Sequence, residues 1–273
     1  MALKIDNNHA GINNLFKTDK SKGTLATNLE RLSSGKQINK AADDAARLAI
    51  ATRFISQIEG SQQAYRNLND GISLAQTGEG AISELSSSVQ RIRELAVQSA
   101  NATLSDSDRQ SLQEEVNMLQ SEINRVTGDT AFNGVSLLNN ASSMDFQVGA
   151  NNGDTVTINT QNVAGQLNSD GLNSIDISTA GGASSALAAA DSALGTLSQS
   201  RAEYGATINR FEAVGRNLQN LEVNLESARS RLEDTDYAQE SANLAANQIR
   251  QQAQTAMQGQ ANAAQGAVLQ LLR

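Results

Sequence analysis

Residues 197–232 read LSQSRAEYGATINRFEAVGRNLQNLEVNLESARSRL, and the spacing of large apolar residues in this stretch decides the fold. One such residue recurs at every seventh position, and a second set lies three residues after several of them. This repeat places both sets along one stripe of an α-helix, as in a coiled coil. The stretch therefore predicts one long helix packed lengthwise against others. The residues spaced by seven are Leu197, Tyr204, Phe211, Leu218, Leu225 and Leu232, and the interleaved ones are Val214, Leu221 and Ala228.

Three more helical patterns occupy the first half of the chain. Apolar residues recur by threes and fours up to a Ser-Ser-Gly break at residues 33–35, and again over residues 41–96. Gly78 and Gly80 lie inside the second pattern, where each costs up to ~1 kcal/mol relative to alanine, so this helix has a place to bend. A third helix is expected to begin after Ser105, whose hydroxyl can cap it.

The middle of the chain, residues 128–178, changes from helical to alternating spacing. Two short stretches alternate apolar and polar residues around the turn sequence at 151–154, and Asn133-Gly134 marks another turn. This pattern predicts a β-hairpin, and Ile175 with Ile177 suggests one more short strand. The alternating apolar residues of the hairpin are Phe146, Val148, Val156 and Ile158.

These patterns together predict a mainly α fold. We expect a long antiparallel, coiled-coil-like helical rod with paired terminal helices and a small β-hairpin insert at the far end. The chain contains no proline, so long helices can run without their main breaker.

Charge and composition exclude several classes of partner. The 273 residues carry 29 Asp and Glu against 21 Lys and Arg, a net charge of −8. A nucleic-acid-binding protein normally presents a basic patch, and an anionic membrane surface attracts basic chains. Cysteine is absent from the sequence, which removes disulfides and thiolate sites. We therefore expect binding to neither nucleic acid nor membrane.

The sequence also bears on targeting. No apolar stretch is long enough to span a bilayer, so membrane insertion is not expected. Residues 1–23 mix apolar with polar residues and lack the continuous apolar region and cleavage site of a signal peptide. The sequence therefore predicts either a cytoplasmic protein or one exported by a route that needs no cleaved signal.

Residues that could perform catalysis are scarce. The single histidine, His9, supports neither a catalytic triad nor a His/Cys zinc site. The carboxylates of Asp43 and Asp44, and those of Asp234 and Asp236, fall where helix ends are expected, and acids complement the helix dipole at an N-terminus. We therefore predict no enzymatic activity, no cofactor and no metal site.

Apolar residues gather near both ends of the chain. They could tuck against the rod, but a two-helix end has too little interior to be stable alone. We therefore favour contact with other subunits and predict a polymerisation interface there. Its expected residues are Leu25, Leu29, Leu32, Val268, Leu269, Leu271 and Leu272.

Several blocks of the sequence resemble bacterial flagellins, in the order in which that family carries them. They include ERLSSG at 30–35, DDAA at 43–46, QRIRELAVQ at 90–98, SRL at 230–232 and QAN at 260–262. The resemblance extends over nearly the whole chain and leaves only a very short variable region. The chain thus looks like a flagellin of a minimal type.

The resemblance implies a structural subunit that polymerises into the extracellular flagellar filament used for swimming. It implies an inner core of terminal helices at 1–44 and 234–273, an outer core at 45–140 and 179–233, and an insert at 141–178. Its implied partners are other copies of the chain and other flagellins, the flagellar export apparatus with its chaperone, and the filament cap and junction proteins. Export would proceed without a cleaved signal peptide.

In some flagellins the outer-core helices are recognised by the flagellin-sensing Toll-like receptor. The resemblance therefore marks a second candidate surface, in which charged residues would offer charge-assisted contacts and a leucine an apolar one. The matching positions are Gln90, Arg91, Leu95, Gln98 and Glu115.

Two alternatives to a filament subunit stay open at this point. One is the hook–filament junction protein, a relative of flagellin with the same helical ends. The other is a flagellin-like surface binding protein, although the small insert leaves little room for a binding pocket.

Overall fold

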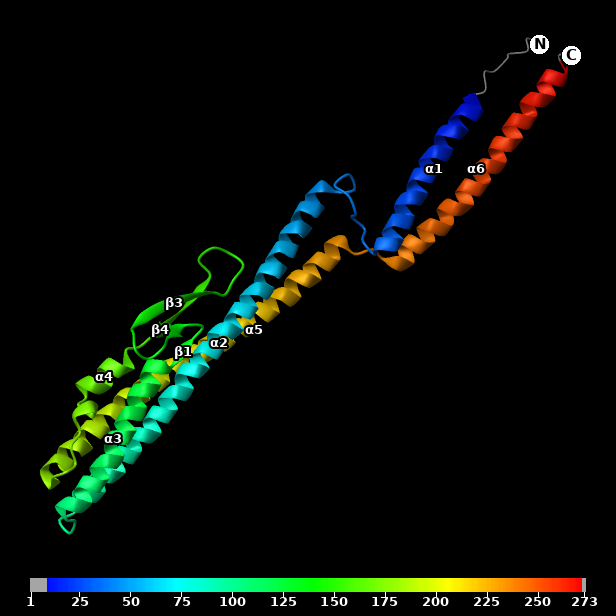
Figure 1. Cartoon of the computed structure of the whole chain (residues 1–273). Coiled ribbons are helices and arrows are strands. Elements are labelled where there is room, and N and C mark those ends of the chain that lie inside the picture. Colours follow the sequence, from blue (N-terminus) through cyan, green and yellow to red (C-terminus); the bar gives the residue numbers. More distant parts are fainter. Residues whose placement is uncertain (1–8, 272–273) are drawn as a thin grey trace. The chain divides into compact units, whose positions relative to one another are not determined.

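The computed structural model describes residues 9–271, and side chains within residues 12–263. Its helices are α1 (His9–Ser34), α2 (Ala45–Ser99), α3 (Asp106–Asp129), α4 (Val163–Ser169), the 3-10 turn η1 (Leu172–Ser174), α5 (Ala180–Glu233) and α6 (Tyr237–Leu271) (Figure 1). Its strands are β1 (Ala131–Phe132), β2 (Val135–Ser136), β3 (Ser142–Gln147) and β4 (Thr155–Thr160). The expected mainly α class is confirmed. Among the helices of residues 9–271, none contains an apolar run that would span a bilayer.

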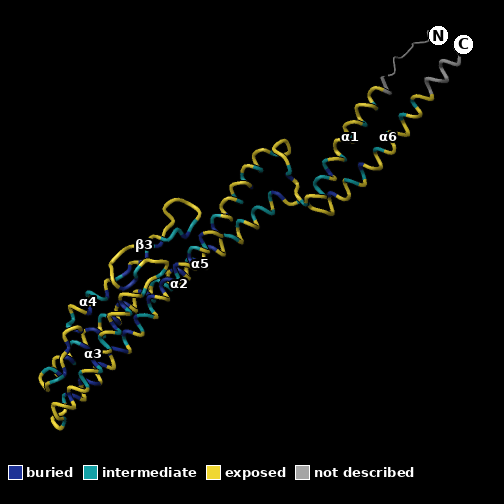
Figure 2. Tube along the Cα trace, in the orientation of Figure 1, coloured by how far each residue is buried: buried dark blue, intermediate teal, exposed yellow. Residues whose placement is uncertain are grey.

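Contacts within the chain divide it into two compact units. One contains both ends of the chain, up to Ser56 and from Asn224 onward, and includes α1 and α6. The other is formed by residues 57–223, with most of α2 and α5 and everything between them. The large hydrophobic cluster lies in this second unit, whereas α1 and α6 are mostly exposed or half-buried (Figure 2).

Helices α2 and α5 run antiparallel in the second unit. Gln62 donates to Glu222 at 2.7 Å, and Arg201 contacts Glu79 at 3.1 Å. Leu197, Tyr204, Phe211 and Leu218 of the predicted seam are buried, while Leu225 and Leu232, in the other unit, are half-buried. The seam therefore forms a tight core only where the helices also meet the other elements of residues 57–223.

Two glycines of α2 accommodate the aromatic residues of this seam. A Cβ atom at Gly78 would lie 2.9 Å from the Tyr204 ring, and one at Gly71 would lie 2.8 Å from the Phe211 ring. Helix α2 continues without interruption past both positions. Gly78 therefore does not interrupt α2, and its lack of a side chain lets the Tyr204 ring approach the helix backbone.

Helix α3 begins with the expected cap. The Ser105 hydroxyl accepts from the Asp108 backbone N–H at 3.2 Å, and the Asp108 carboxylate accepts from the Ser105 N–H in return. The Ser105 hydroxyl also donates to the Asp108 carboxylate at 2.7 Å, and this bond, followed by the one from the Ser105 N–H, lowers the pKa of Asp108. The next residue, Arg109, is buried and donates to the Asn101 carbonyl at 2.9 Å, which fastens the turn between α2 and α3.

The β-hairpin is confirmed where alternation predicted it. Strands β3 and β4 pair antiparallel with Phe146 opposite Val156. A second, shorter pair, β1 with β2, surrounds the predicted turn. Asn133 and Gly134 both adopt positive φ angles, 49° and 81°, which is why an Asn-Gly sequence suits this turn.

The hairpin packs along the side of the helices, which differs from the expected position at their far end. The Phe146 and Phe211 rings meet edge to face with centroids 5.8 Å apart. The Asn67 side chain of α2 donates to the Gln147 carbonyl at 3.0 Å. The alternating face of the hairpin therefore completes the core of the second unit rather than extending it.

The suggested strand at Ile175 and Ile177 is wrong. Both residues are buried, but they follow η1 in extended chain with no strand partner in the described residues. The Gln113 side chain of α3 takes that place, because it donates to the Ile175 carbonyl at 3.2 Å and accepts from the Ile177 N–H at 2.6 Å. A side-chain amide can thus satisfy backbone groups that a strand would otherwise pair.

The burial of Tyr204 makes the stability of this core depend on pH. Its hydroxyl donates to the Leu137 carbonyl at 3.3 Å, and burial, aided by the charge of Glu203, raises the pKa of Tyr204 to about 12. Between pH 10 and 12 the tyrosine is deprotonated in the unfolded chain but still protonated in the folded one. The stability that the buried hydroxyl contributes is therefore fully present below pH 10 and is lost as the pH rises through about 12.

We expect wild type to lose about 1 kcal/mol more of its free energy of unfolding between pH 9 and 11 than Tyr204→Phe. Urea denaturation of both proteins at the two pH values measures the difference. An identical pH dependence in the two proteins would contradict this assignment.

Candidate functional site

Helices α1 and α6 lie side by side and antiparallel in the first unit (Figure 1). Their less exposed residues recur at intervals of three and four, which defines the seam between them. Most of these residues carry amide, hydroxyl or carboxylate groups, so the seam is polar where a coiled coil is normally apolar. The seam consists of Asn14, Thr18, Ser21, Leu25, Asn28 and Leu32 on α1 and Glu240, Leu244, Asn247, Gln251, Gln254 and Gln258 on α6.

Three buried polar residues hold the seam in register. With its amide oriented to satisfy both ends, Asn28 donates to Glu240 Oε1 at 3.0 Å and accepts from Asn247 Nδ2 at 2.9 Å. The Tyr237 hydroxyl adds a bond to the Leu32 carbonyl at 2.5 Å. A shift of either helix would leave the polar groups of Asn28, Glu240 and Asn247 buried without partners, at about 1–3 kcal/mol each.

The linkers beside this pair are fixed by caps and backbone bonds. The Thr235 N–H donates to the Gly35 carbonyl at 2.9 Å, and Lys36 forms an isolated antiparallel bridge with Asp234. Asp44 caps α2 by accepting from two backbone N–H groups, and Asp236 does the same for α6. The acids at these helix ends thus have the structural roles that the sequence suggested.

Several large apolar side chains of the pair lie outside the seam and are exposed. Each is at least half exposed, and Phe16 reaches 69%. An exposed apolar surface on a helix whose partner-facing side is polar indicates a face that a further chain covers. Helical spacing puts Ile12 and Phe16 on the side of α1 away from α6, and Ile249 on the side of α6 away from α1. We use the name outward face for all of these exposed side chains together: Ile12, Leu15, Phe16, Leu29, Ile249 and Met257.

The sequence-predicted interface residues fall in three places. Leu25 and Leu32 are half-buried in the α1–α6 seam, whereas Leu29 belongs to the outward face. Val268, Leu269, Leu271 and Leu272 lie outside the residues whose side chains are described, as does His9.

Sequence analysis missed most of the outward face. Ile12, Leu15 and Phe16 are spaced by three and four like any helical stripe, but they lie in residues 1–23, which were considered only as a possible signal. Ile249 and Met257 are isolated apolar residues in a segment rich in Gln and Ala, so spacing alone did not mark them.

The candidate receptor surface lies in the second unit. Gln90, Arg91 and Gln98 are exposed on α2, and the Arg91 Nε donates to Glu115 Oε1 on α3 at 2.8 Å. The hydrogen bonds that Arg91 donates to Glu115, and to Glu94 at 3.0 Å, raise the pKa of Arg91. Leu95 is different, because it is 1% exposed and packs in the core. Its side chain therefore does not share a surface with the other four.

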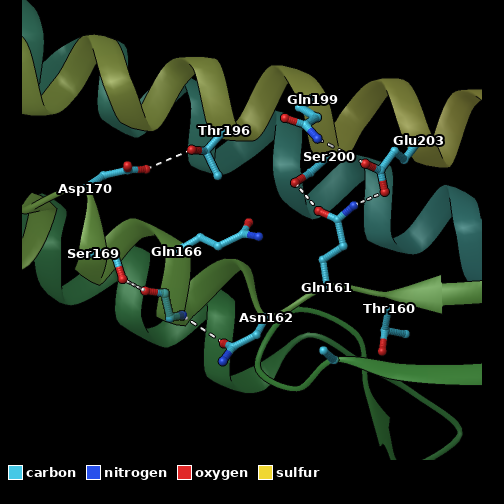
Figure 3. A pocket seen from close by; sticks show the side chains of 12 residues that line it. Thr160, Gln161, Asn162, Gln166, Ser169, Asp170, Thr196, Gln199, Ser200 and Glu203 are labelled. Carbon is cyan, nitrogen blue, oxygen red and sulfur yellow. Dashed lines mark hydrogen bonds between the residues drawn. The ribbon is translucent and has the colours of Figure 1, made fainter.

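A polar hollow of about 670 Å³ lies between α4 and α5 (Figure 3). Asp170 accepts from Ser192 and Thr196, both at 2.8 Å, while Gln161 bonds with Ser200 and Glu203. The side chains around it offer hydroxyls, amides and two carboxylates, but neither an aromatic nor a basic group. They contain no nucleophile paired with a base, and no cluster with metal-binding geometry is found among the described residues.

Comparisons with known proteins match both ends of the chain to one family. The model of the bacterial flagellin N-terminal helical region matches residues 5–143, and that of the C-terminal helical region matches residues 187–272. A flagellin of Halalkalibacterium halodurans is 44% identical over 246 residues, which cover 90% of each chain.

The chain belongs to the bacterial flagellin family.

Two further relatives define its type. The phase 1 flagellin of Salmonella naestved is 49% identical over 63% of this chain but only 34% of its own length. The crystal structure of Bacillus cereus flagellin has a TM-score of 0.50 at 30% identity, covering 56% of this chain and 88% of that one. The chain is thus a flagellin with little sequence between its helical regions, as the resemblance implied.

Proposed function

We propose that this flagellin is the structural subunit of an extracellular flagellar filament that serves swimming motility, and that it assembles through the outward face of α1 and α6. The observation that carries this mechanism is the reversal of polarity in the helix pair. Amides and hydroxyls fill its seam, while apolar side chains such as Phe16 and Ile249 face outward. Covering each large apolar side chain contributes about 1.5–3 kcal/mol.

Assembly then follows from repeated contacts of one kind. A face on one subunit meets a different face on the next, and such heterologous contacts generate a helical polymer when they do not close into a ring. In this proposal the inner core is residues 1–44 and 234–273, the outer core is residues 45–140 and 179–233, and residues 141–178 are the insert.

Partners other than the chain itself form part of the proposal through the family. They are the flagellar export apparatus and its chaperone, the cap and junction proteins, and other flagellins. The N-terminal residues would carry export information without being cleaved. The subunit would act without catalysis, which agrees with the structural roles of Asp44 and Asp236 as helix caps.

Receptor recognition is a second proposed interaction, supported by the exposed Gln90, Arg91 and Gln98 beside Glu115. We expect Arg91→Ala to weaken activation of cells bearing the flagellin-sensing receptor by roughly tenfold, since charge-assisted hydrogen bonds are among the strongest surface contacts. Arg125→Ala, which removes an exposed arginine of α3 that pairs with Glu122, is the matched control. Equal activation by wild type and the Arg91 variant would refute this proposal.

Negative-stain electron microscopy of purified protein, seeded or treated with a precipitating salt, tests filament formation. We expect long uniform filaments from the full chain and monomers from a variant lacking residues 234–273, because that deletion removes α6 and its share of the outward face. Filaments from the truncated chain would contradict the mechanism. Persistent monomers from the full chain would instead favour the junction protein or a surface binding protein.

A further inference from the structure

Methionine is rare in this chain, and one methionine lies on the outward face. The sequence contains four, of which Met118, Met144 and Met257 have described side chains. Met257 on α6 is 63% exposed, and with Ile249 it supplies the α6 part of the outward face. Among the α6 side chains that the structure describes, Met257 is therefore one of two members of the outward face, and the one that carries a thioether.

A thioether is the one apolar group on this face that mild oxidants can change. A peroxide transfers one oxygen atom to the sulfur, which loses two electrons and becomes a sulfoxide, while the peroxide is reduced to water or an alcohol. The product is polar and chiral, and it disrupts apolar interfaces. Ile249 and Phe16 undergo no comparable reaction under these conditions.

We propose that Met257 is an oxidation site that controls assembly, because its sulfoxide prevents a neighbouring subunit from covering the α6 part of the outward face. The inference rests on the proposed function. In the free subunit the sulfur is open to peroxide, whereas burial in a polymer would protect it. Oxidation would therefore act on subunits before they are incorporated.

Met118 provides the internal comparison. It is 66% exposed on α3, so a peroxide should reach it as readily as Met257, but it lies in the other compact unit and outside the outward face. Oxidation at Met118 should leave the α6 contact unchanged. The two exposed methionines thus separate a specific effect from general oxidative damage.

The experiment compares wild type, Met257→Leu and Met118→Leu, each with and without hydrogen peroxide. Leucine keeps volume and apolar character, so all three untreated proteins should elongate seeds at the same rate. Peptide mass spectrometry measures the sulfoxide at each position, and far-UV circular dichroism checks helix content. We expect peroxide to slow elongation about tenfold or more in wild type and in Met118→Leu, but not in Met257→Leu. Methionine sulfoxide reductase should restore the rate.

Two results would overturn the inference. One is undiminished elongation by wild type whose Met257 is shown to be oxidised, and the other is equal sensitivity of Met257→Leu. Failure of untreated wild type to elongate at all would be a different outcome. It would refute the proposed function, and the inference with it.

Discussion

Phe211→Ala should lower the free energy of unfolding by about 3–5 kcal/mol, the range for removing a buried aromatic ring. The ring is 0% exposed, contacts Phe146 edge to face, and fills the space left by Gly71. Its loss leaves a cavity that neither the hairpin nor α2 can fill, because each is held by its own hydrogen bonds, such as that from Asn67 to Gln147. Urea denaturation followed by circular dichroism measures the change.

The matched control lies on the same helix. Val223→Ala removes an apolar side chain that is 65% exposed, and should change stability by no more than about 0.5 kcal/mol. Gly71→Ala tests the other side of the contact, since its Cβ would lie 2.8 Å from the Phe211 ring and overpack the site. A loss below 1 kcal/mol for Phe211→Ala would show that the ring is not central to this core.

Spacing predicted the parts of this fold that depend on periodic burial. The residues spaced by seven from Leu197 to Leu218 are buried, as the repeat requires, and alternation located the hairpin at Phe146 and Val156. Local chemistry was equally informative at Ser105, where the cap needs only residues within the next turn. These features are determined by neighbours in the sequence.

Features determined by distant residues were not predictable in this way. The replacement of a strand by the Gln113 amide depends on α3 lying beside Ile175, which spacing does not show. The burial of Leu95 likewise depends on the elements packed around α2, so a resemblance between sequences could not establish its exposure.

The candidate site was harder still to predict, because its polarity is inverted. Helical spacing of apolar residues predicts that they face the inside of a helix pair. In the α1–α6 seam, however, Leu25 and Leu32 lie among amides, hydroxyls and a carboxylate. The outward face becomes visible only when α1 and α6 are paired. Its apolar residues then lie where no element of the described chain covers them.

Phe16→Ser and Ile249→Ser should each raise the lowest protein concentration at which filaments elongate by about tenfold or more. Each side chain is at least two-thirds exposed in the subunit, and covering it contributes about 1.5–3 kcal/mol, where 1.4 kcal/mol corresponds to a factor of ten. Seeded elongation measured over a range of concentrations gives this threshold directly.

The fold should not change in these variants, because neither side chain lies in the seam that Asn28, Glu240 and Asn247 hold in register. Helix content and unfolding temperature should therefore match wild type, which separates an assembly defect from misfolding. Gln252→Ser, at an exposed polar position of α6, should elongate like wild type. If Phe16→Ser and Ile249→Ser also elongate like wild type, the apolar residues of α1 and α6 do not form the subunit contact, and assembly must depend on other surfaces.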